Sequence, residues 1–111
     1  MNRYDPQQLS FADKIYKIAA DIPRGKVATY GQLAKMAGSP KAARAVGMCM
    51  KHNPDQKIVP CHRVVASDGK LTGYSAQGGV SEKKKKLLKE GVLFLGERVD
   101  LMRSGWGRGK N

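Results

Sequence analysis

A cysteine and a histidine stand side by side near the middle of the chain, as Cys61 and His62. A thiol reacts as its thiolate, and a neighbouring imidazole or cation favours that form. Pro60 fixes its own φ and disfavours helix in the residue before it, so we expect Cys61 on a turn. Apolar β-branched residues on both sides predict short strands at 57–59 and 63–66. For the dipeptide alone, a buried cysteine acting as a small hydrophobe is the commoner interpretation, but the surrounding string favours a nucleophile.

Cys49 and His52 add two further potential ligands for a metal ion. Their spacing puts them about one turn apart on a helix, which is workable geometry for zinc. Adjacent residues such as Cys61 and His62 cannot easily bind one ion together, and the paired spacing of structural zinc sites is missing. We therefore predict no metal site and prefer the nucleophile.

The charge of the chain predicts a polyanionic partner. Its 111 residues carry 21 Lys and Arg against 9 Asp and Glu, a formal charge of +12. Such an excess attracts nucleic acid, although a merely soluble basic protein, such as a ribosome-associated one, would show it too. No apolar run approaches the ~20 residues of a transmembrane helix, and the N-terminus lacks the apolar segment of a signal peptide. We expect a cytoplasmic or nucleoid protein with no membrane contact and with reduced cysteines.

Three helices are predicted in the N-terminal half, and capping boxes at Ser10 and Thr29 begin the first two. The first is amphipathic and serves packing. The second is short and is broken near Gly38, after which Ser39 caps a third helix over residues 40 to about 50. Two short helices joined by a tight glycine-containing turn are typical of a helix-turn-helix, with the later helix as the recognition helix.

A small β wing is predicted to follow. Residues 67–70 have the composition of a hairpin turn, and a last helix begins at 81 and ends before Gly91 as C-terminal cap. Residues 92–101 predict a final strand or hairpin. The expected fold is mostly α with a small β wing (α+β), a winged helix-turn-helix. We expect one domain over residues 1–111, with loose ends at about 1–9 and 103–111.

The predicted recognition helix has an unusual surface. Ala42, Ala43 and Gly47 make it smooth, and Arg44 is the one long side chain among them. A smooth face lets a helix approach a groove closely, and a single arginine can then probe the duplex. The alternative is that Arg44 contacts only phosphate, as most arginines of DNA-binding helices do.

Five stretches, in the same order, resemble the O6-alkylguanine-DNA alkyltransferases, which are self-inactivating DNA repair proteins. They are residues 25–30, 39–47, 53–54, 59–65 and 87–91. The resemblance runs over nearly the whole chain, and five ordered motifs are a far more specific signal than one. It implies double-stranded DNA containing O6-alkylguanine as the partner, bound through the minor groove, with no cofactor. A nucleotide stacked in a duplex must be flipped out before it can react. We also expect a monomer, since no obvious dimerisation segment remains.

The resemblance implies an in-line displacement in which Cys61 attacks the alkyl carbon and keeps the alkyl group. A thiol with a pKa of ~8.5 is mostly protonated at neutral pH, so a base must help. His62 matches the family histidine that reaches the thiol through a bound water, and Glu90 matches the glutamate that orients it, a relative of the hydrolase triad. Tyr30 matches the tyrosine that donates to the base, and Asn53 the asparagine that organises the turn.

The remaining implied contacts are with the duplex and the flipped base. Arg44 matches an intercalating finger that fills the gap left by the flipped nucleotide. The backbone carbonyls of Cys61 and Val64 would accept from the exocyclic amine, and the Ser75 N–H would donate to the guanine oxygen. The residues expected to contact DNA are Thr29, Tyr30, Ser39, Ala42, Ala43, Arg44, Arg63 and Ser67, and those expected to line the pocket are Val64, Tyr74, Ser75 and Lys83.

Three features depart from the commonest family pattern. The chain matches only the DNA-binding and active-site domain of the longer members. Its pocket loop, residues 74–79, is two residues longer than the usual Tyr-x-Gly-Gly. Its length resembles that of the alkyltransferase-like proteins, lesion sensors that usually have Trp where this chain has Cys61. We expect suicidal methyl transfer to Cys61; the alternatives are a lesion sensor that recruits other repair and an ordinary winged-helix transcription factor.

Overall fold

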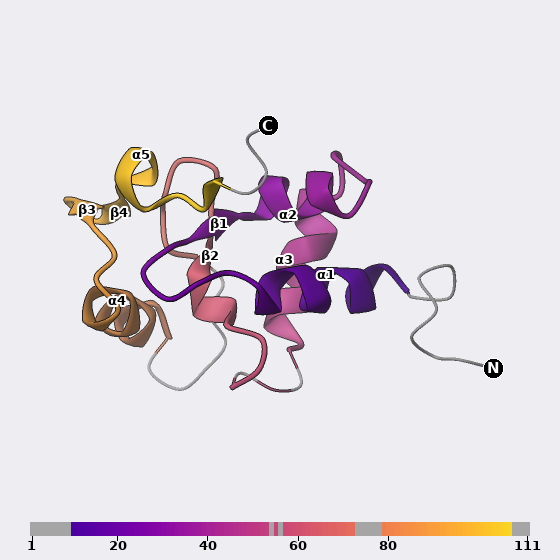
Figure 1. Cartoon of the computed structure of the whole chain (residues 1–111), viewed down its shortest axis with the longest axis horizontal. Coiled ribbons are helices and arrows are strands. Elements are labelled where there is room, and N and C mark those ends of the chain that lie inside the picture. The colour runs from indigo at the N-terminus through magenta and orange to yellow at the C-terminus, as the bar shows by residue number, and fades with distance from the viewer. Residues whose placement is uncertain (1–9, 54, 56, 73–78, 108–111) are drawn as a thin grey trace.

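The computed structural model describes residues 10–53, 55, 57–72 and 79–107. Three helices lie together at one end of the molecule, the last long helix and a small hairpin lie at the other, and a two-stranded parallel sheet runs between them (Figure 1). The elements in chain order are α1 (Phe11–Ala20), β1 (Ala28–Thr29), α2 (Tyr30–Met36), α3 (Ala43–Lys51), the 3-10 turn η2 (Cys61–Arg63), β2 (Val64–Val65), α4 (Gly79–Lys89), β3 (Phe94–Leu95), β4 (Arg98–Val99) and α5 (Leu101–Ser104).

The capping box predicted for α1 is present, with reciprocal hydrogen bonds between Ser10 and Asp13. These bonds satisfy amides that would otherwise lack partners at a helix N-terminus. The helix then buries Ile15 and Ala19 against α2 and α3. The core around these three helices contains Ile15, Ala19, Ile22, Ala28, Leu33, Ala34, Val46, Met50, Val59, Cys61, Val64 and Trp106.

The turn between α2 and α3 explains why one predicted helix start is wrong. Gly38 takes a φ of +87°, and the Ser39 N–H donates to the Ala34 carbonyl at 2.9 Å, which closes the C-terminus of α2. Ser39 therefore ends α2 and does not cap α3. Residues 39–42 form a further turn, and α3 begins at Ala43 without a side-chain cap.

Thr29 caps α2 as predicted, because its hydroxyl accepts from the Gln32 N–H at 3.0 Å. The second hydrogen bond of the predicted capping box, between the Gln32 side chain and the Thr29 backbone, is replaced by another contact of Gln32. Its Nε2 donates to the Trp106 carbonyl at 2.9 Å, which ties α2 to the C-terminal segment.

The winged helix-turn-helix is confirmed, but its β-structure differs in detail from the prediction. The strand predicted at 57–59 is wrong: these residues belong to a turn in which the Val59 N–H donates to the Asp55 carbonyl at 2.9 Å. The second predicted strand shortens to β2, which pairs in parallel with β1, Ala28 beside Val64. The wing consists of the antiparallel β3–β4 hairpin and a bridge from Lys70 to β4.

The turn at 67–70 packs tightly on the wing. Gly69 has a φ of +88°, and a Cβ at this position would lie 2.5 Å from the Val99 carbonyl oxygen. Only glycine fits both constraints. At the end of α4, Gly91 takes a φ of +91° and acts as the predicted C-terminal cap, while the helix begins at Gly79, two residues before its predicted start. A second core, made of Val27, Val65, Leu87, Val92 and Val99, lies beneath the wing and α4.

The predicted loose end from Arg103 is wrong as far as residue 107. Asp100 caps the short helix α5 by accepting from two backbone amides, and Trp106 is buried in the first core. The Trp106 N–H donates to the Val27 carbonyl at 2.7 Å, and the Val27 N–H donates to the Ser104 carbonyl at 2.9 Å. The last described residues thus extend the sheet beside β1. Residues 1–9 and 108–111 lie outside the described parts. None of the described helices is long and apolar enough to cross a membrane.

The anchoring of the C-terminal segment can be tested with Trp106→Ala. Trp106 is 9% exposed, so its truncation leaves a cavity in the first core and should lower the free energy of unfolding by about 3 kcal/mol. Met102→Ala is the matched control, since Met102 is 94% exposed and should change stability by less than about 0.5 kcal/mol. Urea denaturation measures both, and equal effects would contradict the assignment.

Candidate active site

Cys61 opens the turn η2 and is 5% exposed. Its N–H donates to the Val59 carbonyl at 2.8 Å, across Pro60. Asn53 lies beside this turn, with Nδ2 donating to the same Val59 carbonyl at 2.7 Å and Oδ1 accepting from the Asp55 N–H at 3.0 Å. The amide side chain of Asn53 therefore joins the end of α3 to the cysteine turn, which is where Asn53 was expected to lie.

Glu90 follows α4 and meets two side chains of η2. Its Oε2 lies 2.9 Å from Nε2 of His62. Arg63 binds the same carboxylate in a fork, with Nε donating to Oε1 at 2.9 Å and NH2 donating to Oε2 at 2.8 Å. The remaining Arg63 NH1 donates to the Ile22 carbonyl, just after α1, at 2.8 Å. Cys61 thus lies in the same turn as the two partners of Glu90, and Arg63 is a second partner of the carboxylate that the sequence did not predict.

Burial and hydrogen bonding act in opposite directions on these charges. Burial opposes ionisation of Glu90, but the hydrogen bonds from Arg63 and His62 overcome it and lower the pKa of Glu90 to about 2. Burial also lowers the pKa of His62 below its ordinary value, and this outweighs the opposing contact with Glu90. The positive charges of Arg63 and Lys86 lower the His62 pKa further. At neutral pH the site holds an ionised carboxylate and a neutral imidazole.

A second group of polar contacts surrounds Thr72, directly before residues 73–78. The Thr72 carbonyl accepts from the Tyr30 hydroxyl at 3.2 Å and from Nζ of Lys83 at 3.0 Å. Lys83 also donates to the Val64 carbonyl at 2.7 Å and is 1% exposed. Burial lowers the pKa of Lys83 to about 8, against the opposing charge of Cys61. Tyr30, Val64 and Lys83 are thus brought together near the cysteine, whereas Tyr74 and Ser75 lie outside the described residues.

Arg63 was expected to contact DNA, and in the structure its guanidinium is engaged within the protein. Its guanidinium bonds to Glu90 and Ile22, and its side chain is only 17% exposed. The Thr29 hydroxyl is likewise engaged, as the cap of α2. Arg44 is exposed near the start of α3, Ser67 is exposed on the wing turn, and Ser39, Ala42 and Ala43 are half-buried around the helix-turn-helix turn.

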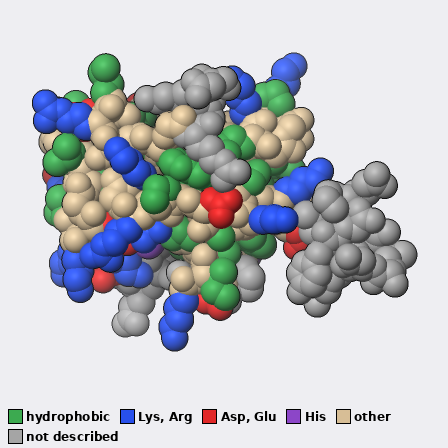
Figure 2. Space-filling view, viewed as in Figure 1, with side chains coloured by type: hydrophobic (Ala, Val, Ile, Leu, Met, Phe, Trp, Pro, Cys, Tyr) green, Lys and Arg blue, Asp and Glu red, His purple; other side chains and the backbone are tan. Residues whose placement is uncertain are grey.

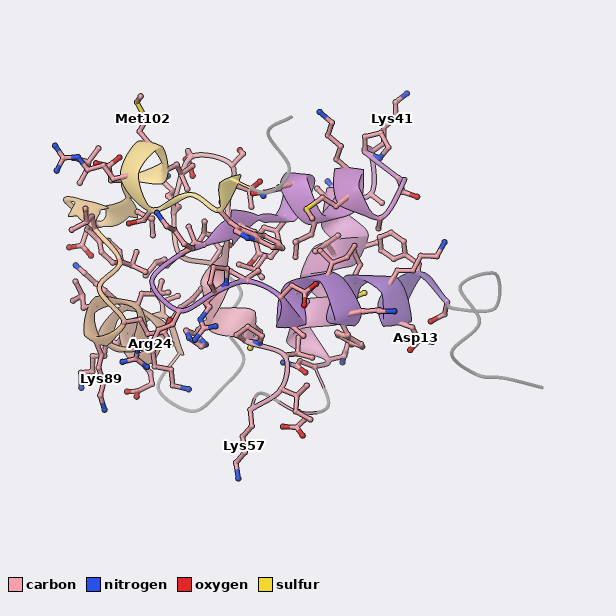
Figure 3. The ribbon with its side chains drawn as sticks, viewed as in Figure 1. Asp13, Arg24, Lys41, Lys57, Lys89 and Met102 are labelled. Carbon is pink, nitrogen blue, oxygen red and sulfur yellow. The ribbon has the colours of Figure 1, made fainter. Side chains whose placement is uncertain are left out.

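Basic side chains extend over both ends of the molecule. Figure 2 shows Lys and Arg atoms gathered at the lower left, over α4, where Figure 3 places Arg24 and Lys89 side by side. The Arg24 guanidinium donates to the Lys89 carbonyl at 3.4 Å. Lys41 extends from the turn between α2 and α3 at the opposite end (Figure 3). The basic surface is therefore broader than the helix-turn-helix.

The four ligands considered for zinc do not form a metal site. Within the described ranges, no three His, Cys, Asp or Glu side chains lie close enough together to hold an ion. Cys49 is half-buried on α3, and its carbonyl accepts from the Tyr16 hydroxyl of α1 at 2.8 Å.

Comparison with known proteins identifies the family of this site. The family described as "6-O-methylguanine DNA methyltransferase, DNA binding domain" matches residues 10–92. This chain belongs to that family. The match includes the cysteine turn, the helix-turn-helix and Glu90, so the resemblance found in the sequence is confirmed over most of the chain.

The relatives within the family include both longer and shorter proteins. A methylated-DNA–protein-cysteine methyltransferase of Methanosarcina acetivorans is 44% identical over 69% of this chain, which covers 49% of that protein. A DNA base-flipping protein of Escherichia coli is also 44% identical, over 87% of this chain and 74% of its own length. The chain therefore spans about half the length of the methyltransferase but most of the base-flipping protein.

Solved structures also include a chain of similar length and a chain about twice as long. S. pombe Atl1 in complex with damaged DNA containing O6-carboxymethylguanine has a TM-score of 0.73 and 36% identity, and the match covers 86% of this chain and 94% of Atl1. The Mycobacterium tuberculosis OGT in complex with DNA has a TM-score of 0.70 and 44% identity, over 75% of this chain and 50% of that one. The fold alone does not separate the longer from the shorter proteins.

The ion pairs of Glu90 predict a specific acid sensitivity. Because its folded pKa is below its unfolded value, Glu90 contributes stability above about pH 4.5, and this is lost as the pH falls toward about 2. Glu90→Gln should be less stable at neutral pH and should lack this additional loss. Glu97→Gln is the control, since Glu97 is 88% exposed in a surface pair with Lys84 and should behave as wild type. Urea midpoints measured from pH 7 to pH 2 test this, and parallel curves for wild type and Glu90→Gln would contradict it.

Proposed function

We propose that this protein repairs DNA by transferring an alkyl group from O6-alkylguanine to Cys61 in a single turnover. The supporting observation is the placement of an ionised Glu90 on His62, directly beside a buried cysteine. A hydrogen-bonded carboxylate and imidazole next to a thiol is the arrangement that activates a nucleophile. Family membership supplies the substrate class, since the matched relatives include methylated-DNA–protein-cysteine methyltransferases.

The proposed step moves one alkyl group and one proton. The Cys61 thiol gives its proton through a bound water to His62, which Glu90 orients. The sulfur then forms a bond to the alkyl carbon while the bond from that carbon to the guanine oxygen breaks. The leaving guanine gains a proton, so the sum of the reaction is a thioether and an unmodified base. We expect no cofactor, and the protein is consumed because nothing in the reaction regenerates the thiol.

Binding of the flipped base requires an exchange of hydrogen bonds. Tyr30 is proposed to donate to the base, but its hydroxyl is now directed at the Thr72 carbonyl, so it must leave that partner. The Val64 carbonyl already accepts from Lys83, and the Cys61 carbonyl accepts from the Val64 N–H. A carbonyl oxygen has two lone pairs, so each can still accept from an exocyclic amine.

The DNA contacts belong to the same proposal. Arg44, exposed on α3, would enter the duplex through the minor groove and fill the space of the flipped nucleotide. The net charge of +12 would supply the affinity that does not depend on sequence. We propose that the chain acts as a monomeric single domain on cytoplasmic or nucleoid DNA.

A lesion sensor is the second candidate, and one observation favours it. The chain matches 94% of the length of Atl1, whose structure contains O6-carboxymethylguanine DNA, but only about half of the methyltransferases. A sensor would bind the lesion and leave Cys61 unmodified. Retention of a cysteine with both relay partners favours transfer over sensing.

Intact-mass measurement distinguishes the two functions. Mixing the protein with a short duplex that carries one O6-methylguanine should add one methyl group in place of one hydrogen, and an unmodified duplex should add nothing. The two cysteines provide a matched pair: Cys61→Ala should abolish the gain and Cys49→Ala should retain it. Lesion-selective binding with unchanged mass would contradict transfer and identify a sensor.

A further inference from the structure

Arg63 is a half-buried charged residue whose role the proposed reaction leaves open. It lies in the same turn as Cys61, and its guanidinium makes three hydrogen bonds: two to the carboxylate of Glu90 and one to the Ile22 carbonyl. An arginine fork on a carboxylate fixes the orientation of both groups, which a single point charge cannot do. Arg63 therefore decides where both oxygens of Glu90 point.

The orientation of Glu90 in turn decides which nitrogen of His62 carries the proton. An ionised carboxylate only accepts hydrogen bonds, so a neutral imidazole 2.9 Å from Oε2 must be protonated on Nε2. Its Nδ1 is then an acceptor. This tautomer leaves Nδ1 able to accept a proton, as the proposed relay from Cys61 requires.

The charges around His62 show why a carboxylate alone would not serve. A carboxylate beside an imidazole favours imidazolium, and a base that already holds its proton cannot accept another. Burial is the largest effect that disfavours imidazolium here, and the cations Arg63 from η2 and Lys86 from α4 add to it, while Glu90 favours imidazolium. Because Arg63 also binds both oxygens of Glu90, it weakens the one interaction that would protonate the base.

We propose that Arg63 is a positioning residue of the relay, which holds the Glu90 carboxylate so that His62 stays neutral with Nε2 protonated and Nδ1 as the proton acceptor for Cys61. The role in transfer rests on the function proposed above, but the state of His62 does not. Arg63 acts through Glu90 and His62, and it touches neither the thiol nor the DNA in this account.

Nitrogen-15 NMR of the free protein tests the proposal, because the shifts of the ring nitrogens report both tautomer and protonation. The chain has two histidines, so His62→Gln assigns the signals and exposed His52 is an internal reference. In the wild type we expect His62 with Nε2 protonated at neutral pH. In Arg63→Gln its titration should move to higher pH, and the signals should show a mixture of tautomers or imidazolium. Arg63→Lys keeps the charge but loses the fork, so it should lie between the two.

The control is Arg24→Gln, which removes an exposed guanidinium that bonds to Lys89, the residue before Glu90. It should leave the His62 signals unchanged. A folded Arg63→Gln with wild-type His62 signals would overturn the proposal. If Arg63→Gln does not fold by circular dichroism, unchanged His62 signals in Arg63→Lys would overturn it equally. The NMR experiment contains no DNA, so a failure of methyl transfer and a failure of this proposal are separate results.

The pH dependence of the methyl-transfer rate gives a second test. Where transfer occurs, the acid limb of this pH–rate profile should move to higher pH in Arg63→Gln, whereas a purely structural defect would lower the rate equally at every pH.

Discussion

The carboxylate of Glu90 is the interaction on which the site depends. Through Arg63 and His62 it joins the end of α4 to the cysteine turn, and through Arg63 it reaches the chain just after α1. A carboxylate at a helix C-terminus faces the unfavourable end of the helix dipole, and its side chain here is only 9% exposed. Such a group is stable only when it is paired and fully hydrogen-bonded. Gly91 makes this position possible, since its left-handed conformation turns the chain away directly after Glu90.

This arrangement also joins two halves of the molecule. Cys61 belongs to the core formed by α1, α2 and α3, whereas α4 contributes Leu87 to the core beneath the wing. The two cores meet at β2, where Val64 belongs to the first and Val65 to the second. The proposed relay therefore crosses from one core to the other. Changes in packing on either side should be felt at the distance between His62 and Glu90, because close-packed interiors transmit displacement.

The sequence predicted this site better than its surroundings. Capping signals located α1 and α2 correctly, and the ordered motifs predicted that Cys61, His62 and Glu90 belong to one site.

The start of α3 was missed because serine is a typical N-cap residue, whereas Ser39 closes the preceding helix. Tertiary packing decides between these two roles. Trp106 was missed because the glycines and charges around it resemble a mobile tail, while its anchors, Val27 and Gln32, lie far away in sequence. Arg63 was placed among the DNA contacts by the family resemblance, and its bonds to Glu90 could not be foreseen because they depend on the position of Glu90 in space. No sequence signal marked Thr72, whose carbonyl accepts from both Tyr30 and Lys83.

The central claim is that His62 activates Cys61, and single-turnover kinetics test it most directly. The rate of methyl transfer from a saturating O6-methylguanine duplex should fall by about 100-fold in His62→Gln, since general-base catalysis by a positioned side chain contributes at least that much. His52→Gln, at an exposed position after α3, should transfer at the wild-type rate. Both variants should still accept one methyl group per chain at the end of the reaction. A wild-type rate in His62→Gln would contradict the account and show that the cysteine needs no base from this side chain.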